Sequence, residues 1–390
     1  MEVKIINNRP VMIWTQEVEE KAMQQIANLT TLPFLFHHLA IMPDVHTGKG
    51  MPIGGVLACQ DAVVPNAVGV DIGCGMCAVK TNWKASTIPS DVLRKQVMRN
   101  IRRRIPLGMD HHKEAQDEAF MPEGHDVDRM TIVKQRQEAI RKEVGTLGGG
   151  NHFIELQHDE DDNLWIMIHS GSRNLGARVG AYYNELAEKL NAMWHSTVDP
   201  NIHMAFLPRG TKEFGLYWME MRYCIDFALC NRRLMMQRIE EVLADALCGI
   251  EFEPMINIAH NYAACETHFG QEVVVHRKGA TLATQGTVGI IPGSQGTASY
   301  IVEGLGNPLS FNSCSHGAGR RLSRTAAVKT LDMNEELKRL DALGIVHAIR
   351  TQNDMQEASG AYKDIEEVIH NELDLVKVRT RLMPVAVIKG

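Results

Sequence analysis

Five side chains that can bind metal ions lie in glycine-rich segments or at the borders of apolar runs. Asp71 and Cys74 are three positions apart in VGVDIGCGMC, residues 68–77. Glycines let the backbone bend tightly, so a carboxylate and a thiolate from one short segment can face the same ion. His152, His169 and His260 each border an apolar, strand-like run. One carboxylate, one thiolate and three imidazoles suit one or two borderline divalent ions.

Each of these residues also has an ordinary structural explanation. An isolated Asp-x-x-Cys is more often a tight turn with a buried cysteine, and a lone histidine is more often a satisfied core or surface residue. Cys74 and Cys77 also form a Cys-x-x-Cys pattern, typical of a redox pair or of half a zinc site. No second Cys-x-x-Cys follows, so a structural zinc ribbon is poorly supported. The conjunction of the five residues is the stronger indication.

Loops of small residues indicate room for a nucleotide. The loop GTLGGGNHFIE, residues 145–155, can offer backbone N–H groups to phosphate, with His152 and Glu155 at the start of the strand that follows. It lacks the Gly-x-x-x-x-Gly-Lys-Ser/Thr pattern and is therefore not a P-loop. The segments IIPGSQGTAS, residues 290–299, and NSCSHGAGRRLSRT, residues 312–325, leave space for a purine and a ribose against the backbone.

His316, in the last of these segments, is a candidate nucleophile. A neutral imidazole nitrogen attacks phosphorus well. The arginines that follow, which we expect on a helix, would offset phosphate charge; they are Arg320, Arg321 and Arg324. The alternative for His316 is a further metal ligand or a cap. Arg173, in the loop HSGSRNLG, suits a bidentate phosphate contact, and its alternative is simple exposure to solvent.

The elements that must position these residues alternate between strands and helices. We predict strands at Val3–Ile6, Leu39–Met42, Gly55–Val64 and Val68–Lys80, a β-hairpin over His152–Ser170 around the turn DEDDN, and short strands within Met255–Leu305. We predict helices at Ser90–Arg104 with capping by Ser90 and Asp91, at about Leu175–His195 and at about Lys212–Leu247, and a mixture of helices and a closing strand in the last eighty residues.

The distribution of the candidate ligands along the chain indicates how many domains it forms. Neither a linker stretch nor a repeat of 20 to 50 residues is present in the sequence. Because ligand-like residues occur along most of the chain, we expect one α+β domain over residues 1–390. Its mixed β-sheets and surrounding helices would enclose a central cleft for metal and nucleotide.

The composition is that of a folded soluble protein. Of 390 residues, 44% are hydrophobic and 23% are charged, and a net charge of -6 excludes a strongly basic protein that coats nucleic acid. No run approaches the roughly 18 apolar residues of a membrane span, and the first residues lack the apolar core of a signal peptide. We therefore expect a cytoplasmic protein with no membrane partner. The eight cysteines are scattered singly and are expected to be reduced.

Several ordered segments together resemble the RtcB family of GTP-dependent RNA ligases, from residue 42 to the terminal VIKG. They are MPDVHTGKG, VGVDIGCGM, GGGNHFIE, HSGSR, HNY, PGS, SHGAGR and AYKDI. By this resemblance, Asp71, Cys74 and His152 would hold one Mn²⁺ ion. Cys74, His169 and His260 would hold a second, with Cys74 bridging. His316 corresponds to the histidine that becomes guanylylated.

The resemblance also implies contacts with the guanosine nucleotide. The matching positions are Asn151, His152, Glu155, His260, Asn261, Pro292, Gly293, Ser294, Gln295, Ser299, His316, Gly317, Ala318, Gly319, Tyr362 and Lys389. For an RNA substrate, the candidate phosphate contacts are Arg173, Lys278, Arg320 and Arg324.

The implied reaction has three steps. His316 attacks the α-phosphate of GTP and releases pyrophosphate; the GMP then passes to an RNA 3′-phosphate; finally an RNA 5′-hydroxyl attacks the activated phosphate and expels GMP. A 2′,3′-cyclic phosphate end would first be hydrolysed. The expected partners are GTP and RNA with these ends, and the resemblance leaves room for an activating protein.

The chain departs from the family pattern at a few positions. Gln295 stands where many members have Met, Thr47 interrupts the usual HLGKG, Cys77 is not usual, and residues 107–132 match weakly. These departures favour a divergent paralogue that serves RNA repair instead of transfer-RNA splicing. Two alternatives from other classes are a dinuclear metal-dependent phosphoesterase and a non-catalytic RNA-binding or metal-sensing protein. The first leaves His316 unexplained, and the second is disfavoured because the nucleophile and all five ligand positions are present.

Overall fold

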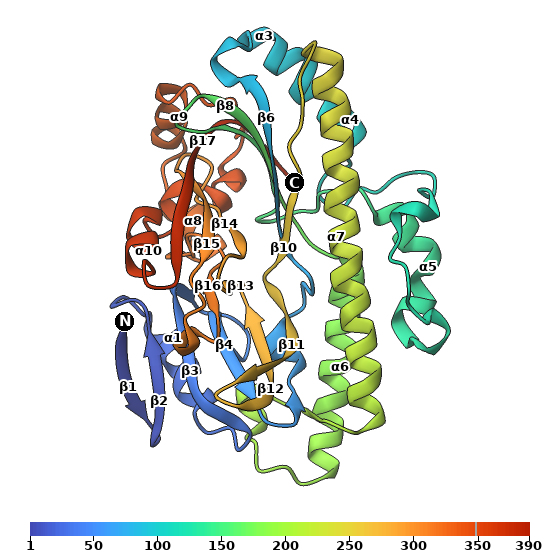
Figure 1. Ribbon diagram of the computed structural model, residues 1–390, viewed down its shortest axis with the longest axis vertical. Helices are drawn as coiled ribbons and strands as arrows, with labels where there is room; N and C mark the ends of the chain where they lie inside the picture. The colour runs from blue at the N-terminus through green and yellow to red at the C-terminus, as the bar shows by residue number, and fades with distance from the viewer. Residues whose placement is uncertain (348) are drawn as a thin grey trace.

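Two large β-sheets form the framework, one above the other in Figure 1. The computed structural model describes residues 1–347 and 349–390. In spatial order, the six-stranded sheet contains β1 (Glu2–Ile6), β2 (Arg9–Ile13), β3 (Leu35–His46), β4 (Ile53–Cys59), β12 (Gln271–Lys278) and β11 (Asn261–His268). Strands β2 and β3 run parallel and the other neighbours antiparallel, so this sheet is mixed.

The second sheet has seven antiparallel strands. In spatial order they are β10 (Ile256–Ala259), β6 (Gly75–Lys84), β8 (Asn163–Ser170), β7 (Phe153–His158), β17 (Val376–Lys389), β15 (Ser299–Gly304) and β14 (Val288–Ile291). Two strand pairs complete the β-structure, β13 (Ala280–Leu282) with β16 (Ser313–Ser315) and β5 (Ala62–Val63) with β9 (Leu207–Pro208).

Helices cover the outer faces of these sheets. They are α1 (Glu20–Leu29), α2 (Pro65–Val68), α3 (Ser90–Val92), α4 (Arg99–Arg104), α5 (Thr131–Glu143), α6 (Arg173–Met193), α7 (Lys212–Ala246), α8 (Arg324–Thr330), α9 (Met333–Ala342) and α10 (Ile365–Asn371). Helix α7 runs along most of the molecule, with α6 packed beside it (Figure 1). Short 3₁₀ turns lie at Ala85–Thr87, Glu118–Phe120, Val127–Arg129, Pro200–Ile202, Pro308–Ser310, Gln352–Glu357 and Ser359–Ala361.

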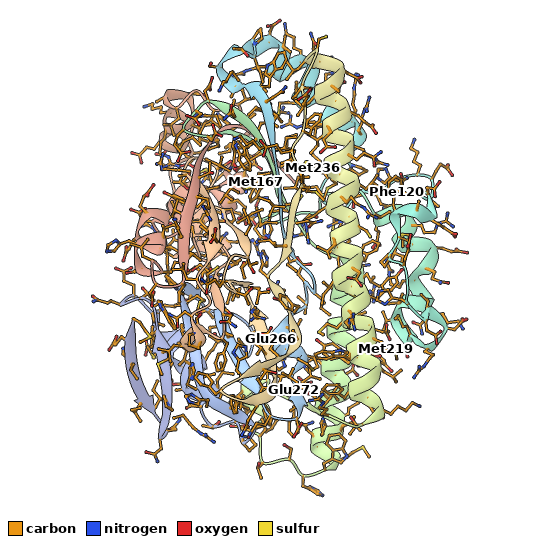
Figure 2. The ribbon with its side chains drawn as sticks, viewed as in Figure 1. Phe120, Met167, Met219, Met236, Glu266 and Glu272 are labelled. Carbon is orange, nitrogen blue, oxygen red and sulfur yellow. The ribbon has the colours of Figure 1, made fainter. Side chains whose placement is uncertain are left out.

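The predicted hairpin shows how the sequence produces the core. In strands β7 and β8, successive residues point to opposite faces. Ile154 and Ile166 pack in a cluster with Met236 of α7, whereas Phe153 and Met167 join a second cluster on the other face. Figure 2 labels Met236 where α7 approaches the sheet that contains Met167. The hairpin and the Met-rich helix are therefore confirmed as core elements.

Two of the predicted strands were wrong in part. Residues 68–74 are not extended, because Pro65–Val68 forms helix α2 and the chain then turns through Gly69 and Gly73, at φ 91° and 77°. Strand β6 begins only at Gly75. The predicted strand Gly55–Val64 is interrupted at Asp61, which has φ 48°, and is divided into β4 and β5. In both places residues with positive φ interrupt the predicted extended conformation: Gly69 and Gly73 before β6, and Asp61 between β4 and β5.

Two details of the helix predictions also required correction. Residues 90–104 are helical, but Leu93–Met98 is a π-helical segment between α3 and α4, and the position before the helix is Pro89, without a side-chain cap. Arg320 and Arg321 precede α8, which begins at Arg324 after the capping residue Ser323. The backbone N–H of Ala326 donates to the Ser323 hydroxyl at 3.1 Å, and this bond sets the start of the helix.

The α+β class is confirmed. The predicted helices over about residues 175–195 and 212–247 agree with α6 and α7 to within two residues at each end, and the closing strand is β17. Within residues 1–347 and 349–390, none of the helices combines the length and apolar character that a bilayer crossing requires.

Candidate metal and nucleotide site

A cavity of about 540 Å³ opens where the two large sheets meet. Its wall includes the following residues singled out from the sequence: Asp71, Cys74, Asn151, Glu155, His169, His260, Asn261, Lys278, Pro292, Gly293, Ser294, Gln295, His316, Gly317, Ala318, Gly319, Arg320, Arg324, Tyr362 and Lys389. Three others lie behind this wall: His152, Ser299 and Arg173. The Ser299 hydroxyl accepts a hydrogen bond from the Gly293 backbone N–H, which supports the 292–295 loop from beneath.

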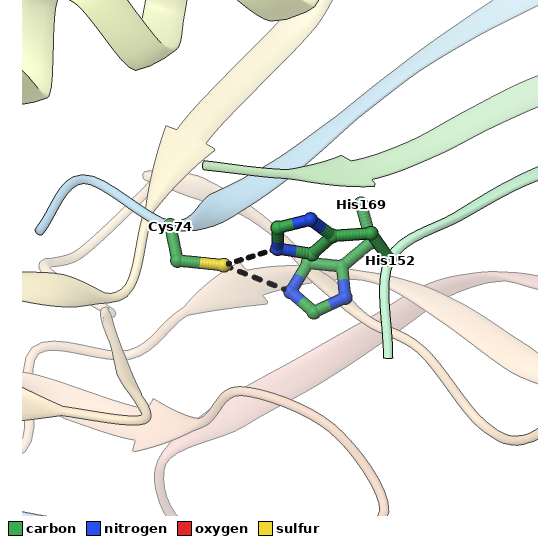
Figure 3. Close-up of side chains that lie close together, drawn as sticks. All are labelled: Cys74, His152 and His169. Carbon is green, nitrogen blue, oxygen red and sulfur yellow. Dashed lines mark hydrogen bonds between the residues drawn. The ribbon is translucent and has the colours of Figure 1, made fainter. Parts of the chain in front are cut away.

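Cys74 lies at the centre of a cluster of potential ligands. Its Sγ is 3.5 Å from Nε2 of His152 and 3.2 Å from Nε2 of His169, as the dashed lines in Figure 3 show. The ligand atoms of these three buried residues all lie within 4.8 Å of one another. His152 Nε2 is also 3.2 Å from Asp71 Oδ2. Two imidazole nitrogens and one sulfur that converge in this way fit a thiophilic or borderline divalent ion.

His260 extends this cluster toward His316. The centroid of its ring is 5.2 Å from that of His169 and 4.9 Å from that of His316. Nδ1 of His260 is buried and has no hydrogen-bond partner among the described residues. The structure therefore brings all five predicted ligands to one side of the cavity, with the predicted nucleophile beside them.

The charge states of the cluster suit metal binding. Burial, together with the neighbouring histidines, lowers the pKa of His169 and His260 well below the usual value, so both imidazoles are neutral, as a ligand must be. Burial opposes ionisation of Asp71, but its hydrogen bond and charge interaction with His152 outweigh burial and lower its pKa. Burial and the nearby Asp71 raise the pKa of the Cys74 thiol. A bound cation would favour the thiolate, because it offsets both effects.

Two glycines make this arrangement possible. A Cβ at Gly73 would lie 2.8 Å from the Ile225 Cα on α7, so only glycine allows the Cys74 loop to approach the helix this closely. A Cβ at Gly171 would overlap the carboxylate of Asp71. Gly73 and Gly171 therefore account for part of the glycine content of the segments VGVDIGCGM and HSGSR.

Asp44 holds His316 in a fixed orientation. Its Oδ2 lies 2.5 Å from His316 Nδ1 and also accepts the His316 backbone N–H at 3.1 Å. Because a carboxylate only accepts hydrogen bonds, this contact places a proton on Nδ1 and leaves Nε2 as the ring nitrogen that could act as a nucleophile. Asp44 is fully buried, and the His316 ring forms part of the cavity wall. His316 is thus held in one orientation beside the metal-ligand candidates.

Roles for Asp44 and His46 could not be predicted from the sequence. Both residues lie in the segment MPDVHTGKG, and Asp44 is 272 positions before His316, so nothing local indicates their contact. His46 lines the cavity with its ring centroid 6.4 Å from that of His316, and burial lowers its pKa to about 4.

A hydrogen-bond network centred on Glu357 connects several residues of the cavity wall. Its carboxylate accepts hydrogen bonds from Tyr362 and, at 3.1 and 2.9 Å, from Arg320 and Arg324. Gln295 donates to the backbone carbonyl of the same residue at 3.2 Å. Gln295, one of the departures from the family pattern, therefore binds the backbone of the residue whose carboxylate orients Arg320 and Arg324.

The four candidate phosphate contacts differ in how exposed their side chains are and in how many hydrogen bonds they already make within the protein. Lys278 is almost fully buried and donates to the carbonyls of Lys49 and Asn66. Arg320 donates from its guanidinium to three other groups of the chain besides Tyr362. Arg173 donates to Thr146 Oγ1 and to the Gly108 carbonyl. Arg324 has a side chain that is 49% exposed, and it is the candidate most accessible to a substrate.

Comparison with known proteins decides the family. A family model described as tRNA-splicing ligase RtcB matches residues 25–390. The chain belongs to the RtcB family. Two Escherichia coli members are similar over its full length: RNA-splicing ligase RtcB1 from one strain and RNA-splicing ligase RtcB from strain K12, each 38% identical over 100% of this chain and 99% of the relative. The tRNA-splicing ligase RtcB of Nanoarchaeum equitans is 32% identical over 98% of this chain and 96% of its own length.

The RtcB match begins before the segments on which the resemblance was based and extends to the last residue. The resemblance is confirmed, and with it the assignment of this chain to a family of RNA ligases. The glycine loops, the Cys and His cluster and the cavity all lie within the matched residues 25–390.

Proposed function

We propose that this protein joins an RNA 3′-phosphate or 2′,3′-cyclic phosphate end to a 5′-hydroxyl end, with GTP as the energy source and a covalent His316–GMP intermediate. The observation that carries the proposal is His316, oriented by buried Asp44 and placed 4.9 Å, between ring centroids, from a histidine of the metal cluster. A hydrolase with two metal ions would not require an oriented histidine nucleophile at this position.

In the first step His316 Nε2 attacks the α-phosphorus of GTP. An N–P bond forms, the bond to the oxygen that bridges the α- and β-phosphorus breaks, and pyrophosphate leaves with the electron pair. The ring gains positive charge, which the Asp44 carboxylate stabilises through Nδ1–H. Mn²⁺ ions held by Asp71, Cys74, His152, His169 and His260 would draw charge from the phosphate oxygens and lower the pKa of the attacking 5′-hydroxyl.

In the second step a 3′-phosphate oxygen of the RNA attacks the same phosphorus and frees His316. The RNA 5′-hydroxyl then attacks the activated 3′-phosphate, and GMP leaves. Arg173, Lys278, Arg320 and Arg324 are our candidates for RNA phosphate contacts, with Arg324 the most accessible.

The guanosine would lie against the small-residue loops. We assign its contacts to the 292–295 and 316–319 loops and to Asn151, Glu155, Asn261, Ser299, Tyr362 and Lys389. With the exception of Ser299, which supports the 292–295 loop from behind, these residues line the cavity. Their small side chains leave the backbone accessible to the base and the ribose.

The test is incubation of the purified protein with Mn²⁺ and α-phosphate-labelled GTP, followed by a denaturing gel. We expect acid-labile label on the natural protein and none on His316→Ala, while the surface variant His37→Ala labels normally. Addition of RNA with 3′-phosphate and 5′-hydroxyl ends should remove the label and yield ligated RNA. Folded, metal-loaded protein that takes no label would refute the proposal, and RNA cleavage without GTP would establish a phosphoesterase instead.

Glu155 predicts a pH dependence of GTP binding. Burial raises its pKa to about 7, partly offset by Lys389. The carboxylate form accepts guanine N–H groups and predominates above this pKa, so binding should weaken as the pH falls. We expect the Kd for GTP to rise about tenfold between pH 8 and pH 6, as measured by calorimetry. Glu155→Gln should bind more weakly at pH 8 and show a flat profile, and an equally steep profile in this variant would contradict the assignment.

A further inference from the structure

Arg232 on helix α7 is a buried cation that contacts the segments carrying Cys74 and His169. The proposed chemistry does not use this residue. Its side chain is fully buried, and it lies behind the cavity instead of in its wall. No sequence motif pointed to it. A buried guanidinium is costly in free energy unless it is hydrogen-bonded and its charge is balanced, so its presence requires an explanation.

The guanidinium connects two ligand-bearing segments through their backbones. Its Nη1 donates to the Gly73 carbonyl at 3.1 Å and to the Ser170 carbonyl at 2.8 Å. Gly73 directly precedes Cys74, and Ser170 directly follows His169. A single group therefore fixes the loop of one ligand against the strand end of the other, and the side chains of these two ligands meet at an Sγ–Nε2 distance of 3.2 Å.

The guanidinium is itself held from a third segment. Its Nε donates to Asn257 Oδ1 at 2.7 Å, and the Asn257 side chain donates in turn to the Leu229 carbonyl of α7 at 3.1 Å. Asn257 lies on β10, three residues before His260. Through Nη1 and Nε, Arg232 thus relates the positions of three ligand segments to one long helix, while its buried Nη2 has no hydrogen-bond partner among the described residues.

Arg232 is held by hydrogen bonds and not by an ordinary ion pair. Among residues 1–347 and 349–390, no carboxylate lies within salt-bridge distance of its guanidinium, whose partners are two backbone carbonyls and one amide oxygen. Burial lowers the pKa of Arg232, which is the expected cost of placing this group in the interior. These three directed hydrogen bonds are therefore the contacts that explain its position.

We propose that Arg232 is a positioning residue of the metal centre, which holds Cys74 and His169 at ligand separation. The inference rests on the metal site of the proposed function but not on its GTP or RNA chemistry. Outer groups that orient ligands in this way commonly change metal affinity 10- to 100-fold when they are removed.

The experiment titrates the metal-free full-length protein with Co²⁺ alone, whose sulfur-to-metal charge-transfer absorption reports a bound thiolate. We expect Arg232→Met to lower Co²⁺ affinity at least about tenfold and to weaken the charge-transfer band per bound ion. Arg232→Lys, which keeps the charge but not the fork, should recover part of both. Phe227→Leu, a buried change on the same helix, controls for general destabilisation and should leave affinity and spectrum unchanged.

Wild-type affinity and absorption in folded Arg232→Met would overturn the proposal, and so would equal losses in Phe227→Leu. If Arg232→Met does not fold, the test uses Arg232→Lys. A Co²⁺ affinity and an absorption spectrum of Arg232→Lys equal to those of the natural protein would also overturn the proposal. Because the readout needs neither GTP nor RNA, failure of self-guanylylation and failure of this inference are distinguishable.

Discussion

Replacement of Asp44 by asparagine is expected to slow the labelling of His316 by GTP about a thousandfold, without loss of bound metal. The carboxylate accepts the Nδ1 proton of His316 at 2.5 Å, so Nε2 is the ring nitrogen left for attack on phosphorus. An asparagine amide can donate to Nδ1 and select the other tautomer, and it does not balance the positive charge that forms during attack. Single-turnover labelling with α-phosphate-labelled GTP measures the effect.

The informative control for this variant is Asp374→Asn. Asp374 is a carboxylate outside the cavity that accepts the Trp14 indole N–H at 3.0 Å, so its replacement tests whether loss of a structural acid alone slows labelling. We expect near-normal rates for this control. Labelling of Asp44→Asn within tenfold of the natural protein would show that His316 does not depend on Asp44 for its tautomer or charge.

Replacement of Cys74 by alanine is expected to remove tight metal binding and with it all detectable guanylylation. Cys74 Sγ is the atom that both His152 and His169 approach, so its loss leaves the imidazoles without their shared neighbour. Metal content after dialysis and label on the protein are the two measurements. Near-normal labelling of this variant would refute the role of Cys74 as a ligand.

Cys77→Ala is the matched control for this second variant. Cys77 is three residues further along, fully buried, and packed with Val79 and Ile168 in an apolar cluster. This environment explains Cys77 as a core residue. Its replacement should cost about 1 kcal/mol of stability through the small cavity it leaves, while metal content and labelling are retained.

The sequence predicted elements best where side-chain periodicity matches burial. The alternation in β7 and β8 and the helical spacing of apolar residues in α6 and α7 correspond to packed faces, so these elements appeared within two residues of their predicted ends. Helix α5 was not predicted. Its interior residues Val133 and Ile140 pack against the core, but most of its surface is polar and its apolar stripe is narrow.

The sequence-based predictions fail where glycine determines the backbone conformation, and where a residue's role depends on a contact with a distant part of the chain. The apolar run 68–80 has the composition of a strand, yet positive φ at Gly69 and Gly73 turns its first part into the loop that carries the ligands. The five candidate ligands could be selected by residue type and neighbouring glycines. Asp44 and Arg232 could not, because each acts through a contact with residues far away in the chain, and nothing in their local sequence indicates that partner.

His260 is the one residue between β10 of the seven-stranded sheet and β11 of the six-stranded sheet. Its backbone N–H donates to the Cys74 carbonyl at 2.8 Å, and the Asn261 carbonyl accepts the Gly73 N–H at the same distance. The predicted ligand is therefore also a direct covalent connection between the two sheets. An ion bound by His260 and Cys74 would add a further cross-link at this connection, between the loop before β6 and the start of β11.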